Sequence, residues 1–538
     1  MPELDLQKLL ASDNLVEDKE HKDGKKLPAG KESPDKKDAK SEGEPTPQAP
    51  AGGGLLKLLK QEKTSKEKLI ESYGNVDIVD VGDELYLYRV KLPNLTPADH
   101  KVIESVQKVA VKIIDTRRES TNSKIRKQNL RQKIYSMISK TSSIKVSESK
   151  MQAYADIISR EMGGYGLIDY LIDDDQLEEI MVVPPRRRVY VFHRKHGMLL
   201  TNIDIESDEY TTNVIERIAR DVSRRVDTNT PLLDARLPSG DRVNATLQPA
   251  SVDGPSLTIR KFREDPYTIV DMIKFKTLNP EAAAFLWVAA EGLQAFPSNI
   301  LISGGTSSGK TTLLNCISMF VRPTERVLTI EDTAELKLPL KHWVRMETKP
   351  PSIEGTGEIS MDVLLKNALR MRPDRIIVGE VRHSEAFTLF TAMNTGHQGS
   401  MGTIHANTSE ETLVRLMSPP MNIPEQMATA LNLIVVLNRI NVPKAGLTRR
   451  ITEIAEVTGT KKPELHMLYE WNSEKDDIVQ VDKISSVKKK IQKYSGLSSS
   501  RIEDELSIRE ELLAAAAKKD ITSLASFSTF IQKYYEKQ

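Results

Sequence analysis

The chain has 538 residues, a length that allows two to four domains. Its 77 Lys and Arg nearly balance its 76 Asp and Glu, and the formal net charge of +1 gives no general reason to expect a polyanionic partner. A single cysteine excludes an internal disulfide and a cysteine-rich zinc or iron–sulfur site. No apolar run approaches the roughly 18 residues of a membrane-spanning helix, and residues 1–15 lack the apolar core of a signal peptide. These features predict a soluble, multidomain protein of a reducing compartment.

Residues 1–53 are predicted to form a flexible N-terminal arm and linker. Residues 21–53 contain seven Lys, six Asp or Glu, five Pro and five Gly, and Leu27 is their only large apolar residue. Such a segment cannot bury enough apolar surface to offset the entropy lost on ordering, so we expect it to be disordered. Four of the first ten residues are leucines, which indicates either a short amphipathic docking helix or a frayed terminus.

An accessory region is expected at residues 54–150. Apolar residues on both sides of Gly82-Asp83 predict a hairpin, and helical spacing predicts a helix at 97–114. Residues 117–150 carry ten Lys or Arg and only two acids. We expect this basic run to be a solvated face, and the alternative is a surface for anionic lipid or an acidic partner.

Residues 151–265 are predicted to form an α/β domain. Helical patterns occur at 151–162 and 211–226. Strand patterns occur at 179–183, 189–193 and 256–262, and residues 236–242 form a turn between two extended segments.

Residues 266–460 are predicted to form a second α/β domain, and residues 461–538 a C-terminal helical tail preceded by short strands. Helical patterns separate the strand patterns of the second domain, and this alternation predicts a mostly parallel sheet that is covered on both faces. The strand patterns lie at 299–303, 326–331, 374–379, 400–405 and 431–437. In the tail, residues 502–519 predict a helix.

The strongest motif begins directly after the apolar strand pattern and precedes a helix predicted at 311–320. It matches G-x4-G-K-[ST], with the residues Gly304, Gly305, Thr306, Ser307, Ser308, Gly309, Lys310 and Thr311. Small residues let backbone N–H groups surround a β-phosphate, and the helix N-terminus adds its dipole. We expect Lys310 to reach the β- and γ-phosphates of ATP and Thr311 to ligate Mg²⁺, with Thr312 completing the nucleotide-binding residues.

An acidic cluster follows the next predicted strand. Glu331, Asp332 and Glu335 lie within seven residues of one another, and a hydrolase needs a carboxylate that orients or deprotonates water. Glu331 and Glu335 are therefore candidate catalytic residues. In isolation such a cluster would be a solvated turn, and its place one strand after the phosphate-binding loop favours the functional interpretation.

A Walker B pattern and two histidines complete the chemistry. The apolar run 375–380 ends in Glu380, which a buried strand would deliver beside Mg²⁺, either as a ligand or through a metal-bound water. His405, at the end of the next predicted strand, is a candidate partner for a phosphate or a catalytic carboxylate. His397 and His405 do not have the spacing of a zinc site.

Two groups of arginines are further candidates, because phosphoryl transfer gains from a mobile positive charge near the γ-phosphate. Arg236, Arg242 and Arg260 precede the phosphate-binding loop, and Arg370, Arg372 and Arg382 lie near the Walker B stretch. The alternative for each of them is ordinary surface charge.

Together these motifs resemble those of the secretion ATPases of type II and type IV secretion and type IV pili. The phosphate-binding loop, the acidic box 329–336, the Walker B stretch and the histidine box 396–405 follow the family's order. The amino-acid sequence of residues 302–306 and 367–382 resembles that of the archaeal branch, above all the motor ATPase of the archaellum. The chain lacks the tetracysteine zinc element that is frequent in the bacterial pilus-assembly branch.

This resemblance implies a hexameric ring of two-domain subunits. Each subunit would have an α/β N-terminal domain, a hinge near 263–267 and a RecA-like P-loop domain, with ATP and Mg²⁺ bound between the domains. Glu335 would be the water-activating carboxylate and Glu380 the Walker B acid. Arg236 and Arg242 match the segment that the family brings toward the phosphates.

The implied function is that of a cytoplasmic motor at the inner face of the cell membrane. It would drive assembly, and also rotation, of the archaellum filament through a polytopic membrane platform protein and accessory cytoplasmic proteins. The same motifs would serve an archaeal adhesion pilus or a type II secretion machine. A nucleic-acid translocase has only the basic run for support, and no nucleic-acid partner is expected. A weakly hydrolysing scaffold is disfavoured by the full set of carboxylates.

Overall fold

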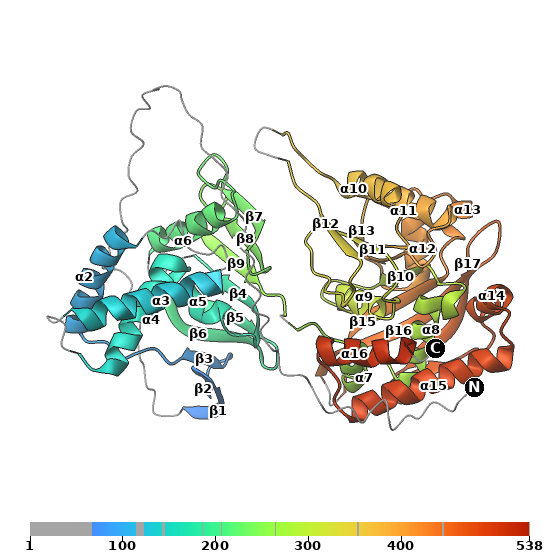
Figure 1. Ribbon diagram of the computed structural model, residues 1–538, viewed down its shortest axis with the longest axis horizontal. Coiled ribbons are helices and arrows are strands. Elements are labelled where there is room, and N and C mark those ends of the chain that lie inside the picture. Colours follow the sequence, from blue (N-terminus) through green and yellow to red (C-terminus); the bar gives the residue numbers. More distant parts are fainter. Residues whose placement is uncertain are drawn as a thin grey trace, which may run out of the picture. The chain divides into compact units, whose positions relative to one another are not determined.

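The computed structural model describes most of the chain beyond the predicted arm. The described residues are 67–536, apart from 115–122, 142–145, 185–186, 206, 264, 352–354 and 444–445. They form two compact units, which we call the N-terminal unit (67–262) and the C-terminal unit (263–536), and each is described by itself (Figure 1). The arm and linker expected at 1–53 lie outside the described residues. In the described part of the chain, none of the helices combines the length and apolar character needed to cross a membrane.

The N-terminal unit is built on a nine-stranded sheet. Every neighbouring pair of its strands is antiparallel except β3 and β6, which are parallel. From edge to edge the strands are β1 (Lys68–Tyr73), β2 (Val76–Asp80), β3 (Leu87–Val90), β6 (Gly197–Ile205), β5 (Arg187–His193), β4 (Leu177–Val182), β9 (Ser256–Arg260), β8 (Arg242–Thr246) and β7 (Leu232–Arg236). The hairpins expected around Gly82 and around 236–242 are confirmed. Alternate residues of β6 are buried, as a sheet with one face on a core requires.

Helices cover this sheet and form a second apolar core among themselves. They are α2 (Pro97–Ile113), α3 (Ser123–Lys140), α4 (Glu148–Gly163), the 3₁₀ turn η2 (Gly166–Ile168), α5 (Asp169–Ile172) and α6 (Asp208–Asp221). Thr96 and Asp99 cap the start of α2 reciprocally, which fixes where that helix begins. Ile103, Ile134 and Ile158 pack where α2, α3 and α4 meet.

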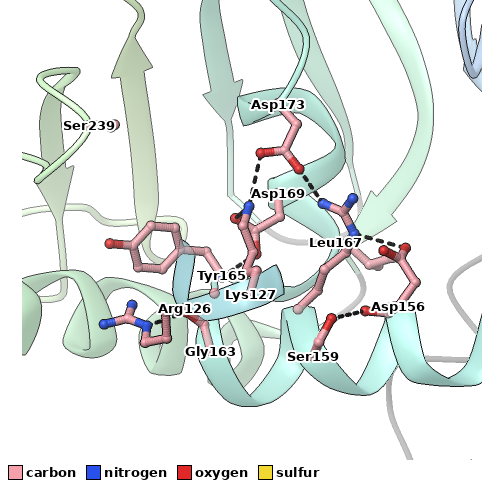
Figure 2. Close-up of polar contacts among 12 residues, drawn as sticks. Arg126, Lys127, Asp156, Ser159, Gly163, Tyr165, Leu167, Asp169, Asp173 and Ser239 are labelled. Carbon is pink, nitrogen blue, oxygen red and sulfur yellow. Dashed lines mark hydrogen bonds and ion pairs between the residues drawn. The ribbon is translucent and has the colours of Figure 1, made fainter. Parts of the chain in front are cut away.

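The basic run at 117–150 is only in part the solvated face that we expected. Figure 2 shows Lys127 of α3 between two carboxylates, and its Nζ lies 3.0 Å from Asp169 and 2.9 Å from Asp173. The neighbouring Arg126 pairs with Asp221 at 2.9 Å. Buried cations need such partners, because an unpaired charge is costly to remove from water.

Lys150 also forms an ion pair within this unit, because its Nζ lies 2.8 Å from the carboxylate of Asp99 that caps α2. At least three of the ten cations, Arg126, Lys127 and Lys150, therefore hold parts of this unit together. The basic run is accordingly a weaker candidate surface for lipid or nucleic acid than its charge count indicates.

The C-terminal unit has a second nine-stranded sheet, whose first six strands are parallel and whose last three are antiparallel additions. In order they are β12 (Trp343–Glu347), β11 (Val327–Glu331), β13 (Arg375–Val381), β14 (Met401–Ile404), β10 (Ile300–Ser303), β15 (Leu433–Val442), β16 (Gly446–Thr458), β17 (Glu464–Asn472) and β18 (Asp477–Gln480). All five parallel strands predicted from the sequence are present. Because β10, β11, β13 and β14 run in parallel, their carboxyl ends meet at one edge of the sheet.

Helices lie on both faces of this sheet (Figure 1). They are α7 (Ile269–Lys274), α8 (Pro280–Glu291), α9 (Lys310–Ser318), α10 (Met361–Ala368), α11 (Glu385–Asn394), α12 (Ser409–Met417), α13 (Glu425–Ala428), α14 (Ser486–Ser495), α15 (Ser499–Lys518) and α16 (Leu524–Tyr535), with 3₁₀ turns η3 (Gly292–Gln294) and η4 (Leu369–Met371). In β10, Ile300 and Ile302 belong to one core and Leu301 to the other. This division confirms a sheet covered on both faces, an α/β RecA-like fold.

Residues 461–536 belong to the C-terminal unit. Strands β17 and β18 extend its sheet, and α15 and α16 pack on α8 and the end of α9. The guanidinium of Arg509, which is fully buried, lies 2.9 Å from Glu291 and 2.6 Å from Glu505. The indole of Trp287 donates a hydrogen bond to Tyr535 at 2.8 Å. The segment is therefore part of the structural core that supports the phosphate-binding loop.

Candidate functional site

The phosphate-binding loop connects β10 to α9 at the carboxyl edge of the parallel strands. Its backbone adopts left-handed conformations at Ser307 (φ 57°) and Gly309 (φ 100°). At Gly304 a Cβ atom would lie 2.1 Å from the carbonyl oxygen of Leu437, so only glycine fits against β15. The loop is thus curled tightly at the start of a helix, the arrangement in which backbone N–H groups bind phosphate.

Lys310 lies folded over this loop. It is 7% exposed, and its Nζ donates hydrogen bonds to the carbonyl oxygens of Gly304 at 2.9 Å and Gly305 at 2.8 Å. Burial lowers the pKa of Lys310, while the carboxylate of Glu380 opposes this shift. An anion that entered the loop would compete with two neutral carbonyls for a desolvated ammonium, which favours anion binding.

Glu380 lies within β13, one residue before the strand ends, and is surrounded by cations. Its Oε2 accepts a hydrogen bond from Arg382 at 2.7 Å, and its Oε1 lies 3.6 Å from Nε2 of His405. Burial raises the pKa of Glu380, but Arg382, His405 and Lys310 outweigh it and leave the pKa lowered. The carboxylate is therefore ionised at neutral pH, as a metal ligand must be.

His405 follows β14 directly and reaches the same carboxylate. Burial and the charge of Lys310 lower the pKa of His405, so its imidazole is neutral at pH 7. The hydroxyl of Thr403 donates a hydrogen bond to the carbonyl of Gly379 at 2.6 Å and thereby ties β14 to β13. The tie keeps His405 and Glu380 at adjoining strand ends.

The two candidate water-activating glutamates differ in environment. Glu331, the last residue of β11, is 2% exposed, and its Oε2 accepts hydrogen bonds from the backbone N–H of Glu335 at 2.7 Å and of Leu336 at 2.9 Å. Burial raises the pKa of Glu331 to about 7, against the opposing effect of these two donors. Glu335 lies on the following loop and is only partly buried.

Three buried oxygens at this strand edge have no hydrogen-bond partner among the described residues: Ser308 Oγ, Glu331 Oε1 and Glu380 Oε1. Buried polar atoms are normally satisfied, so unsatisfied ones gathered around a loop of this kind fit a site that is completed by a ligand. Among the described residues, no three His, Cys, Asp or Glu side chains could hold a metal by themselves.

Arg236 and Arg242 lie in the other unit, on the hairpin β7–β8. Arg242 pairs with Asp234 at 2.9 Å, and Arg236 donates a hydrogen bond to the carbonyl of Gly240 at 3.1 Å. The C-terminal unit thus brings together the phosphate-binding loop, Glu380, His405 and the acidic loop. The approach of the two arginines to that site stays a prediction.

Two basic residues beside the site escaped the sequence analysis. Arg449 of β16 donates a hydrogen bond to the carbonyl of Ser307 at 3.1 Å, and Arg415 of α12 lowers the pKa of both Lys310 and His405 through its charge. Arg415 could have been noticed as the first arginine after the histidine box. Arg449 carries no local signal, because only the pairing of β15 with β16 places it against the loop.

Residues 162–488 match the family model described as "Type II/IV secretion system protein". An uncharacterized protein of Methanocaldococcus jannaschii is 52% identical over 243 residues, which are 45% of this chain and 33% of that protein. A putative conjugal transfer protein of Mycobacterium tuberculosis is 31% identical over 323 residues, 58% of this chain and 89% of that protein. The crystal structure of the VirB11 ATPase from the Brucella suis type IV secretion system is 26% identical over 53% of this chain and 92% of that one, with a TM-score of 0.28.

Proposed function

Since this chain belongs to the type II/IV secretion ATPase superfamily, we propose that it is a motor that hydrolyses ATP and works on a secretion or filament-assembly machine. The observation that carries the proposal is the meeting of Lys310, Glu380 and His405 at the carboxyl edge of the parallel strands. Ligands of open α/β sheets bind at this edge.

In this proposal each group of the site has one task. The N–H groups of the loop 304–309 and the ammonium of Lys310 bind the β- and γ-phosphates of ATP, with Thr312 beside them. The hydroxyl of Thr311 and the carboxylate of Glu380 would hold Mg²⁺, which supplies charge neutralisation to the phosphates when it is bound. Glu335 accepts a proton from the attacking water, because it is the more accessible of the two loop glutamates.

Neutral His405 donates a hydrogen bond toward Glu380 or the γ-phosphate, which keeps the reacting groups in place. Arg236 and Arg242 would leave their contacts within the hairpin β7–β8 and reach the phosphates as the units close. A hexameric ring, which the family resemblance implies, would let a neighbouring subunit supply this charge.

The finer proposal is that the motor assembles, and also turns, an archaellum filament through a membrane platform protein at the cytoplasmic face of the membrane. The sequences of the motifs and the 52% sequence identity to a protein of Methanocaldococcus jannaschii support an archaeal machine. An adhesion-pilus or type II secretion motor is the alternative, since its catalytic half would be the same. Loss of swimming with normal pili in a null strain supports the archaellum, and normal swimming with lost pili or secretion rejects it.

The biochemical test is ATP turnover by the purified full chain, measured across protein concentration with and without archaeal lipid vesicles. We expect turnover per subunit to rise steeply with concentration, because neighbours complete the site, and to rise further with vesicles. Lys310→Ala should lower turnover at least ~100-fold. Absence of turnover at every concentration, with or without vesicles, would reject the hydrolytic function in favour of a nucleotide-binding scaffold.

A further inference from the structure

The loop after β11, which carries Glu335, is held from three sides. One carboxylate oxygen of Glu331, Oε2, accepts hydrogen bonds from the backbone N–H groups of Glu335 and Leu336. From β12, Arg345 donates hydrogen bonds to the carbonyl oxygens of Ala334 at 3.3 Å and Leu336 at 3.1 Å. The loop that presents Glu335 is therefore fixed through its backbone.

The third contact ties this loop to the helix of the phosphate-binding loop. The N–H of Lys337 donates a hydrogen bond to Oδ1 of Asn315 at 2.8 Å, and Asn315 is a buried residue of α9. This hydrogen bond connects the loop that holds Glu335 to α9, whose first residue is Lys310.

The side chain of Glu331 is buried, whereas that of Glu335 is only partly buried. Glu331 packs against β13, where a Cβ atom at Gly379 would lie only 3.0 Å from its Cγ. Glycine at this position therefore makes room for Glu331 directly beside Glu380. The carboxyl group of Glu331 therefore lies between β13, which carries Glu380, and the loop that carries Glu335.

We infer that Glu331 is a positioning residue: its Oε2 holds Glu335 in place for water activation as a hydrogen-bond acceptor, and its charge is not required. The inference rests on the proposed ATPase function and separates two glutamates that the sequence analysis treated as equals. A carboxyl group with a proton on Oε1, the oxygen without a partner among the described residues, still accepts both N–H groups on Oε2. The raised pKa of Glu331 agrees with a role that works in either protonation state.

The test measures kcat and KM of the full chain for five variants. Glu331→Gln keeps an acceptor oxygen without the charge, and Glu331→Leu removes the acceptor at similar size. Glu335→Gln removes the proposed base, and the double variant Glu331→Leu/Glu335→Gln measures whether the two residues are coupled. The matched control is Glu347→Leu, because Glu347 ends the neighbouring strand β12 in register with Glu331 and is exposed.

We expect Glu331→Gln to retain at least about a third of the wild-type kcat, and Glu331→Leu to lose about tenfold or more with KM changed by less than about twofold. Glu335→Gln should lose about 100-fold or more, and adding Glu331→Leu to it should cost less than about twofold further, since nothing remains to be positioned. Glu347→Leu should stay within about twofold of wild type.

Equal losses in Glu331→Gln and Glu331→Leu would show that the charge is needed and overturn the inference. Independent losses in the double variant would also overturn it, because Glu331 would then act by itself. Binding of a fluorescent ATP analogue and cooperative thermal unfolding check the fold of each variant. If Glu331→Leu does not fold, Glu331→Gln decides: a kcat below about a tenth of wild type rejects the inference. A wild-type chain without turnover would instead reject the proposed function.

Discussion

At the residue scale, the glycines of the loop 304–309 differ in whether the surrounding atoms leave room for a side chain. Gly304 faces the backbone of Leu437 at a distance that excludes a Cβ atom, whereas at Gly305 a Cβ atom would meet only Oδ1 of Asn407 at 3.5 Å. Both glycines belong to the same motif. The packing of β15 against the loop distinguishes them, together with Oγ of Ser308, which would lie 2.6 Å from a Cβ atom at Gly304.

We therefore expect Gly304→Ala to lower the free energy of unfolding by about 1–3 kcal/mol through overpacking, and to weaken nucleotide binding as the loop shifts. Gly305→Ala should change the free energy of unfolding by less than about 0.5 kcal/mol. Chemical denaturation and titration with a fluorescent ATP analogue measure both effects. Equal destabilisation by the two variants would contradict the packing argument.

The residues of the candidate site divide by how local their signal is. The P-loop, Glu331, Glu335 and Glu380 could be named in advance because each lies in a short motif at a predicted strand end. Arg449 could not be named, because it reaches Ser307 only through the pairing of β16 with β15. The distinction between Glu331 and Glu335 also required the structure, since burial and backbone contacts separate two glutamates of one box.

At the scale of the elements, α15 is locked to α8 by a buried ion pair. Arg509 is fully buried between Glu291 and Glu505, and its guanidinium also lies over the rings of Trp287 at 5.3 Å and Tyr534 at 4.9 Å. Removing one partner of such a group leaves the other charges desolvated and unpaired.

Arg509→Ala should therefore lower the free energy of unfolding by about 3–5 kcal/mol. Arg501 is the matched control, because it pairs with the same Glu505 at 2.7 Å but is 39% exposed. Arg501→Ala should cost less than about 1 kcal/mol. Urea denaturation of the full chain measures both free energies of unfolding. Similar losses in the two variants would show that the burial of Arg509 does not add to the stability of the fold.

Element types were better predicted than element boundaries. The parallel strands of the C-terminal unit coincide with short apolar runs, which are typical of strands buried on both faces. Strand β10 begins one residue later than its pattern predicted and ends where predicted. Helix α6 runs from Asp208 to Asp221, whereas the pattern indicated 211–226. Helix α3 was hidden in the basic run, because residues such as Lys127 point inward only where Asp169 and Asp173 receive them.

At the scale of the whole molecule, the candidate residues are divided between the two units. The C-terminal unit holds the phosphate-binding loop, the acidic loop, Glu380 and His405, together with its own apolar cores. Arg236 and Arg242 belong to the N-terminal unit. Nucleotide binding and catalysis are therefore expected to be separable.

Residues 263–538 expressed alone should bind a fluorescent ATP analogue within about threefold of the full chain, because the contacts that the described residues make with the P-loop lie in that unit. ATP turnover should fall at least ~100-fold, since the arginines are missing. The full chain with Arg236→Ala and Arg242→Ala should reproduce this combination of retained binding and lost turnover. Full turnover by the separate unit would remove the two arginines from the proposed mechanism.

The sequence by itself determined the phosphate-binding motif, and with it the nucleotide chemistry that we propose, because a P-loop, its following helix and acids at strand ends are local patterns. It also determined the α/β class, since apolar runs alternate with helical patterns. Only the tertiary structure decided which carboxylate anchors a loop, which cations are internal partners, and that residues 461–536 belong to the core of the P-loop unit. Those properties depend on contacts between residues far apart in the chain, which local patterns do not specify.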